Sequence, residues 1–262
     1  MGNQNGCNKN VKIIYHPDYL TSYPTASCES PDRVSSILND ISKVYEIVKP
    51  EPCTEEDILL CHSSGLLSME KTDRNRYEVA RLAAGGAVMA AGLAIEGYRT
   101  FGLIRPPGHH ANPDHNWGFC FFNNIAIAIR KLINDGKISS AVILDIDLHY
   151  GDGTEAVFQY DDNVTVINIS ASNPEDFIKE TSHSLDLAPS SDIIGISAGF
   201  DQYILDWGGN LSTEDYQKIG TMAGEYAMDR AGGRIFAVLE GGYYIPDLGK
   251  NTLALIKGMC GI

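Results

Sequence analysis

Short apolar runs alternate with longer amphipathic stretches along this chain. The runs are typical of strands that are buried on both faces of a sheet, and they lie at 11–16, 101–105, 141–147, 164–170, 193–199 and 234–240. The amphipathic stretches predict helices at 75–97, 122–134, 175–185 and 212–230. Because strands alternate with helices, we expect right-handed crossovers and a mostly parallel central sheet. The sequence therefore predicts an α/β fold, and its 262 residues suit one large domain or two small ones.

One of these runs leads directly into charged residues. The strand at 141–147 contains Asp145 and Asp147 and is followed by His149, so that the three residues are spaced by two. In an extended segment such residues point to one side, and two carboxylates and an imidazole would converge. Charged groups at the end of a buried strand are costly unless something compensates them, and a divalent metal ion is the obvious candidate. An acidic loop without a metal is the plainer alternative.

Three further strands end in residues that can carry chemistry. A rigid Pro-Pro-Gly segment follows the strand at 101–105, and the side chains after the three strand ends are His109 and His110, then Asp201, then Tyr243. In parallel α/β sheets, sites lie at the carboxyl ends of the strands. Each ending alone could be a turn, a cap or a packed aromatic. Four such endings in one chain favour a shared site.

Together these segments resemble the motifs of the histone deacetylase family, which includes bacterial and archaeal members and the acetylpolyamine deacetylases. The matching segments follow the family's order and are RPPGHHA at 105–111, GFCFFNNIAIA at 118–128, DIDLHYGDGTEAVF at 145–158, SAGFD at 197–201 and LEGGY at 239–243. The resemblance implies the arginase/deacetylase fold, which is a single three-layer α/β/α catalytic domain over residues 1–262. It also implies hydrolysis of the amide of an acetylated or short-acylated amine, such as acetyl-lysine on a protein or an acetylpolyamine.

The resemblance assigns the metal ligands to Asp147, His149 and Asp201. Zinc is the expected ion, and ferrous iron is the alternative because two carboxylates and one imidazole form a hard ligand set. A potassium ion is implied near Asp145, Asp147, His149 and Asn168. A narrow substrate channel is implied beside Gly118, Phe119 and Gly242.

The resemblance also implies the catalytic roles. His110 would act as general base and then as general acid, with His109 as its electrostatic partner. Asp145 would orient His109 and Asp152 would orient His110, because a carboxylate fixes the tautomer of an imidazole and raises its basicity. Tyr243 would donate a hydrogen bond to the oxyanion.

The chain departs from the family in two short loops and at one residue. The segments 170–174 and 63–76 are shorter than the loops that build the active-site rim in larger relatives. We therefore expect a wider, shallower entrance, or walls that a neighbouring subunit of a homo-oligomer supplies. Tyr150 stands where many relatives have a second histidine, and we expect altered packing there with the metal retained.

Composition narrows the classes of partner. The net charge of −14 argues against nucleic acid and suits a cationic or neutral small ligand. The six cysteines form no CxxC pair, so reduced thiols and a cytoplasmic location are expected. No apolar run approaches about 20 residues, so no membrane span is expected.

Two other functions stay open at this point. A ureohydrolase such as arginase shares the general fold, but it would need a DxHxD ligand motif, and here the third acid is Asp152, three residues after His149. Tyr243 would also have no comparable task in such an enzyme. The second alternative is a non-catalytic binding module that keeps the fold and the metal as a scaffold.

Overall fold

Seven strands form one all-parallel sheet in the computed structural model, which describes residues 10–262. The strands are β1 (Val11–Ile14), β2 (Glu46–Val48), β3 (Arg99–Gly102), β4 (Ala141–Asp145), β5 (Val164–Asn168), β6 (Ile194–Ala198) and β7 (Ile235–Leu239). Their order in the sheet is β2-β1-β3-β7-β6-β4-β5. The predicted parallel sheet is therefore confirmed. Residues 1–9, with Cys7, lie outside the described part.

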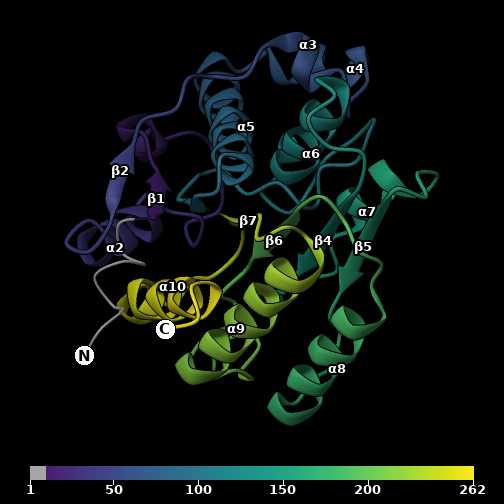
Figure 1. Ribbon diagram of the computed structural model, residues 1–262. Helices are drawn as coiled ribbons and strands as arrows, with labels where there is room; N and C mark the ends of the chain where they lie inside the picture. The colour runs from purple at the N-terminus through teal and green to yellow at the C-terminus, as the bar shows by residue number, and fades with distance from the viewer. Residues whose placement is uncertain (1–9) are drawn as a thin grey trace.

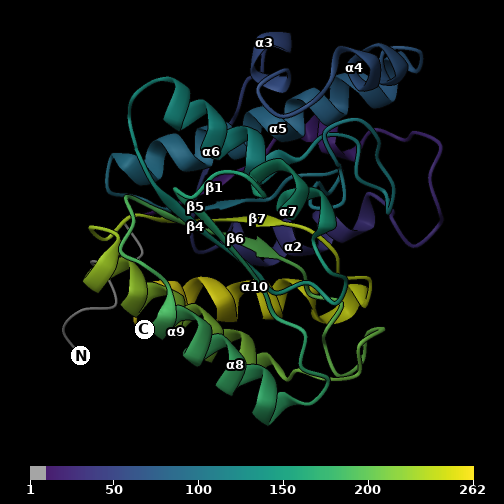
Figure 2. The same ribbon diagram turned by 90° about the vertical axis from the view of Figure 1, so that its right-hand side faces the viewer.

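Helices cover both faces of this sheet (Figures 1 and 2). One layer contains α3 (Glu55–Ile58), α4 (Ser64–Glu70), α5 (Arg74–Ile95), α6 (Asn124–Asn134) and α7 (Asp152–Phe158). The other contains α2 (Asp32–Ile41), α8 (Pro174–Leu187), α9 (Thr213–Arg230) and α10 (Ile245–Met259). A short 3-10 turn, η1, spans Pro17–Leu20. The three-layer architecture is as predicted.

The long helix α5 packs beside α6 against the sheet (Figure 2). Its stripe of alanines is buried, and a side chain at Gly85 would lie 2.0 Å from the backbone oxygen of Glu51. By length and composition α5 alone among the described helices could cross a membrane, which the apolar runs did not indicate. However, 61% of its most apolar window is buried inside the fold. Its packing is that of a core helix.

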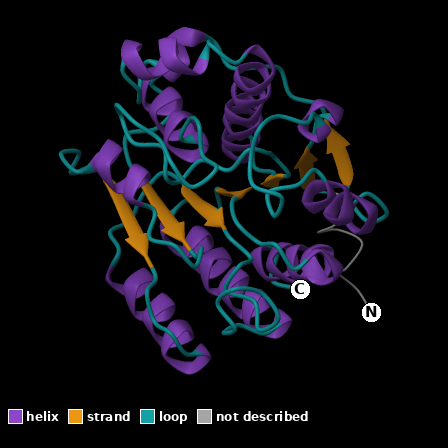
Figure 3. Ribbon diagram, turned by 180° about the vertical axis from the view of Figure 1, so that it is seen from behind, coloured by secondary structure: helices purple, strands orange, loops and turns teal. Residues whose placement is uncertain are grey.

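The order of the strands brings the predicted site together. β3, β7, β6 and β4 are consecutive in the sheet, and these are the four strands that end in the chemically active segments. Figure 3 shows the strands side by side between the two helical layers. Because all pairs are parallel, the four carboxyl ends meet at one edge of the sheet.

His62 is a buried histidine that ties the loop after β3 to the start of α6. Its Nδ1 lies 2.9 Å from the backbone oxygen of Asn112, and its Nε2 accepts the backbone N–H of Asn123 at 2.9 Å. Nε2 can accept only in the neutral ring, so Nδ1 donates to Asn112. Burial lowers the pKa of His62 to about 4, against an ordinary value of 6.5.

The depressed pKa of His62 predicts a loss of stability in mild acid. Between about pH 6.5 and pH 4 the unfolded chain binds this proton and the folded chain does not, so stability falls as the pH falls. The expected contribution is about 2–3 kcal/mol of unfolding free energy. Urea unfolding at pH 7 and pH 4.5 of the parent and of His62→Gln measures it. Equal pH slopes for the two proteins would contradict the assignment.

Candidate active site

The proposed metal ligands converge at the ends of β4 and β6. Ligand atoms of Asp147, His149 and Asp201 all lie within 4.8 Å of one another. His149 Nδ1 is 3.1 Å from Asp147 Oδ1 and 3.0 Å from Asp201 Oδ2. Both aspartates are buried, and the imidazole is partly exposed toward the cavity. The sequence prediction that these three side chains meet is therefore supported by the geometry.

The arrangement fits a divalent cation. Asp201 Oδ2 is buried and has no hydrogen-bond donor directed at it among the described residues, although His149 Nδ1 lies 3.0 Å away. The remaining oxygens are held by backbone: Leu148 N donates to Asp201 Oδ1 at 2.9 Å, and Gly241 N donates to Asp147 Oδ2 at 2.8 Å. Burial and the charge of Asp147 raise the pKa of Asp201 to about 7. A shared cation would compensate this pair of buried carboxylates.

The convergence has a different local cause from the one that the sequence indicated. β4 ends at Asp145, so the next residues are not extended strand. Instead, Asp145 Oδ1 accepts the N–H of Asp147 at 3.1 Å, and Asp147 Oδ1 accepts the N–H of His149 at 2.9 Å. Two successive turns of this kind, in which an aspartate caps the amide two residues later, direct the side chains.

Two histidine–aspartate pairs lie beside the ligand set. His109 Nδ1 is 2.9 Å from Asp145 Oδ2, and His110 Nδ1 is 2.7 Å from Asp152 Oδ1. The two imidazole rings lie 4.0 Å apart between centroids. Both pairs match the partners that the resemblance implied. Asp152 is thus engaged with His110 and is not part of the ligand group, which argues against the arginase alternative.

The two histidines differ in protonation. Burial lowers the pKa of His110 to about 4, and the charge of His109 adds to this effect. Burial also opposes protonation of His109, but the charges of Asp145 and Asp147 outweigh it and raise the pKa of His109 well above its ordinary value. At neutral pH the His110 ring is therefore neutral and can accept a proton, whereas the His109 ring is protonated.

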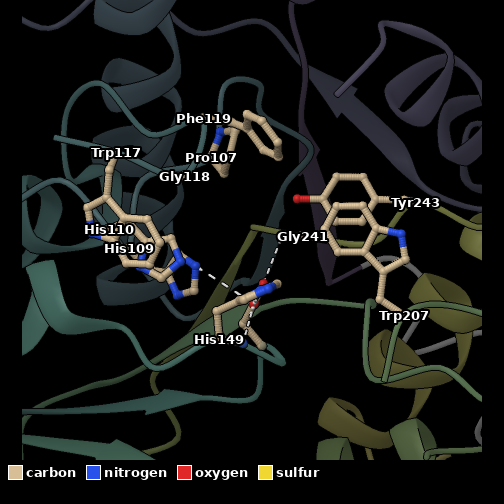
Figure 4. A pocket seen from close by; sticks show the side chains of 11 residues that line it. Pro107, His109, His110, Trp117, Gly118, Phe119, His149, Trp207, Gly241 and Tyr243 are labelled. Atoms are coloured by element: carbon tan, nitrogen blue, oxygen red, sulfur yellow. Dashed lines mark hydrogen bonds and ion pairs between the residues drawn. The ribbon is translucent and has the colours of Figure 1, made fainter. Parts of the chain in front are cut away.

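A cavity of about 190 Å³ opens over these groups, and Tyr243 forms one of its walls. Figure 4 shows the hydroxyl of Tyr243 pointing into this cavity, opposite His109 and His110. Burial raises the pKa of Tyr243 above its ordinary value, so the hydroxyl stays protonated and can donate. Phe119 and Gly118 also line the cavity, as the resemblance implied, and the Phe119 ring meets Tyr243 edge-on. Gly241 lines it rather than Gly242, whose carbonyl faces Arg33.

Both tryptophans of the chain flank this cavity, and sequence reasoning assigned neither a role. The Trp117 ring lies on His110, with centroids 3.9 Å apart, and its Nε1 donates to both oxygens of Asp152 at 3.2 and 3.0 Å. Trp207 stacks on Tyr243 on the opposite side, with centroids 4.1 Å apart and planes at 21°. These two rings line opposite sides of the cavity.

A buried polar network below the cavity was also missed. Glu240 Oε2 accepts the backbone N–H groups of Gly108 and His109 at 2.6 and 3.1 Å and thereby fixes the histidine loop. Arg33 donates to the carbonyl of Gly242 at 2.6 Å and to that of Glu240. A signal existed, because Glu240 belongs to the LEGGY segment and Arg33 follows Ser-Pro-Asp. However, a glutamate or an arginine alone does not predict such a role.

Two of the residues predicted to bind potassium lie on neighbouring strands. Asp145 and Asn168 are partners in the register of β4 and β5, which brings two of the proposed ligands to adjacent strand ends. Asn168 Oδ1 accepts the N–H of Gly151 at 2.8 Å. The site stays a prediction.

The chain is similar to several known proteins. The family model described as the histone deacetylase domain matches residues 27–183. A probable deacetylase of Methanothermobacter thermautotrophicus is 30% identical, over 95% of this chain and 90% of the relative. The histone deacetylase-like amidohydrolase of Pseudomonas aeruginosa is 29% identical, over 89% and 77% respectively. The crystal structure of the HDA15 HD domain superposes with a TM-score of 0.87 at 23% identity, over 97% of this chain and 90% of that chain, and so shares its fold.

Proposed function

The chain belongs to the histone deacetylase family, and from this premise we propose that it is a metal-dependent deacetylase acting on an acetylated or short-acylated amine. The observation that supports this most is the meeting of a ligand set, two histidine–aspartate pairs and a tyrosine hydroxyl around one cavity. Acetyl-lysine on a protein and acetylpolyamines are the proposed substrates.

Asp147, His149 and Asp201 would hold the divalent ion, which when bound polarises the amide carbonyl and lowers the pKa of a water molecule toward about 7. We propose zinc, with ferrous iron as the alternative, because oxygen and nitrogen donors suit both ions. The chain itself fixes the ligand carboxylates through backbone hydrogen bonds. The N–H of Gly241 holds Asp147, and the N–H of Leu148 holds Asp201.

His110 would move the proton. Its bond to Asp152 occupies Nδ1 and leaves Nε2 for the substrate side. The low pKa of His110 keeps this nitrogen able to accept a proton from the attacking water, which it would then give to the leaving amine. Protonated His109 would favour the negative charge that develops beside it.

Tyr243 would stabilise the oxyanion. A neutral hydroxyl that is held rigidly and aimed at developing charge is the kind of donor this role needs. Phe119 and Trp117 would exclude water from the sides of the extended substrate.

Replacing Tyr243 with Phe tests this proposal. We expect kcat to fall by about 10²–10³-fold, the usual cost of one oxyanion donor. The protein is loaded with zinc or iron separately and assayed with a fluorogenic acetyl-lysine peptide and with N-acetylputrescine. Tyr160→Phe is the matched control, because Tyr160 is 93% exposed, and it should leave kcat unchanged.

Two negative results of this experiment would contradict different parts of the proposal. Loaded parent protein that turns over no acyl-amine would favour the non-catalytic binding module. Turnover that is equal in the parent and in Tyr243→Phe would show that the oxyanion assignment is wrong while the deacetylase proposal stands.

A further inference from the structure

The loop from Asp201 to Leu211 joins the metal-ligand set to Tyr243. It starts at a proposed ligand and folds back on it, because Gly208 N donates to the backbone oxygen of Asp201 at 2.7 Å. Asn210 N and Leu211 N both donate to the backbone oxygen of Gln202, at 3.0 and 2.8 Å. The loop is therefore closed by its own backbone hydrogen bonds.

Asp206, within this loop, holds the backbone of the LEGGY segment. One carboxylate oxygen, Oδ2, accepts the N–H groups of Tyr243 and Tyr244 at 2.6 and 2.7 Å. The other, Oδ1, accepts the N–H of Trp207 at 2.8 Å. One side chain thus fixes the backbone of Tyr243 and the start of Trp207 together. Hydrogen bonds of an ionised carboxylate to N–H groups are among the stronger ones.

Trp207 holds the ring of the same tyrosine. Its indole stacks on one face of Tyr243, while the guanidinium of Arg33 lies over the ring at 4.9 Å from its centroid. The indole also meets the His149 ring at 90°, with centroids 6.1 Å apart. Trp207 is 53% exposed, so packing in the core does not explain its position.

We infer that Asp206 and Trp207 are positioning residues that clamp Tyr243 with its hydroxyl directed into the cavity. The clamp fixes both the backbone and the ring plane of the donor, and the closed loop anchors it to Asp201. The inference rests on the proposed function, since it concerns the oxyanion donor of that reaction. Positioning matters at this scale, because a displacement of about 1 Å can cost about 10²-fold in rate.

A double-mutant cycle tests the clamp. We expect Trp207→Ala to lower kcat by about 10- to 100-fold, and Trp207→Phe, which keeps a stacking ring, to stay within about 3-fold of the parent. In the Tyr243→Phe background, Trp207→Ala should then lower kcat by less than about 3-fold, since the hydroxyl it positions is gone. Leu205→Ala is the matched control: Leu205 is equally exposed on the same loop, and the change should leave kcat unchanged.

Additive effects of Trp207→Ala and Tyr243→Phe would overturn the inference, because a general structural or binding role would act in both backgrounds. Trp207→Ala with parental kcat would overturn it as well.

A second arm needs no turnover, so it separates failure of the clamp from failure of the proposed function. In Trp117→Phe protein, Trp207 is the only tryptophan, and acrylamide quenching reports its accessibility. We expect Asp206→Ala to increase quenching about two-fold, because it frees the N–H groups that hold the stack together. Unchanged quenching would overturn the role of Asp206, whether or not the protein proves to be a deacetylase.

Discussion

Replacing Asp201 with Ala is expected to abolish turnover and to release the metal ion. The side chain is buried at the end of β6 and supplies one of the three converging ligand atoms. A bound metal contributes several kcal/mol to stabilisation of the transition state. Since each 1.4 kcal/mol is a factor of ten, kcat should fall by more than about 10³-fold.

The measurements are metal content by mass spectrometry and turnover of the acetylated substrate after reloading with zinc. Asp162→Ala is the control, because Asp162 is an exposed carboxylate outside the site, and it should keep both metal and activity. An Asp201→Ala protein that retained full metal content and turnover would remove the basis of the proposed site.

Much of this site is predictable because strand ends and local spacing carry the information. The four runs that precede His109, Asp145, Asp201 and Tyr243 are short, apolar and buried, and their parallel pairing brings the four ends to one edge. No local pattern in the sequence predicts the order of the strands in the sheet. It was the shared chemistry of the endings that indicated a common site, and the adjacency of β3, β7, β6 and β4 explains it.

The two tryptophans could not be found in this way. Trp117 and Trp207 lie in irregular loops, where no periodicity relates a side chain to a face. Trp117 contacts His110 and Trp207 contacts Tyr243, and the sequence spacing within each pair does not predict the contact. Only the three-dimensional path of the loops reveals these contacts.

Helices α2, α3, α4, α7 and α10 and strand β2 were not predicted, and for β2 and α10 the physical reason is visible in the structure. β2 has three residues at the sheet edge, and two of them are exposed, so it shows no buried apolar run. α10 carries glycines that lower helix propensity. Gly258 of α10 faces Gly220 of α9, and a side chain at Gly258 would lie 2.1 Å from the backbone oxygen of Gln217. Close packing of the two helices therefore overrides the local preference.

The largest loss of stability is expected from Glu29→Gln. Glu29 is fully buried, and its Oε1 lies 2.8 Å from Arg105 Nε and 3.3 Å from Arg33 Nη1. Both guanidinium groups are also buried, so removing the carboxylate charge leaves two cations without compensation. Breaking a buried ion pair in this way costs about 3–5 kcal/mol, a large part of the stability of an ordinary domain.

Urea unfolding measures this loss, and Glu175→Gln is the matched control. Glu175 pairs with Lys179 on the surface, where both side chains are mostly exposed and solvent screens the pair, so its loss should leave the stability nearly unchanged. A Glu29→Gln protein within about 1 kcal/mol of the parent would contradict the prediction.

The stability of this network also bears on the reaction, because Arg33 holds the carbonyl of Gly242 and lies over the ring of Tyr243. Folded Glu29→Gln protein should therefore lose kcat through the oxyanion donor, although Glu29 itself lies outside the cavity.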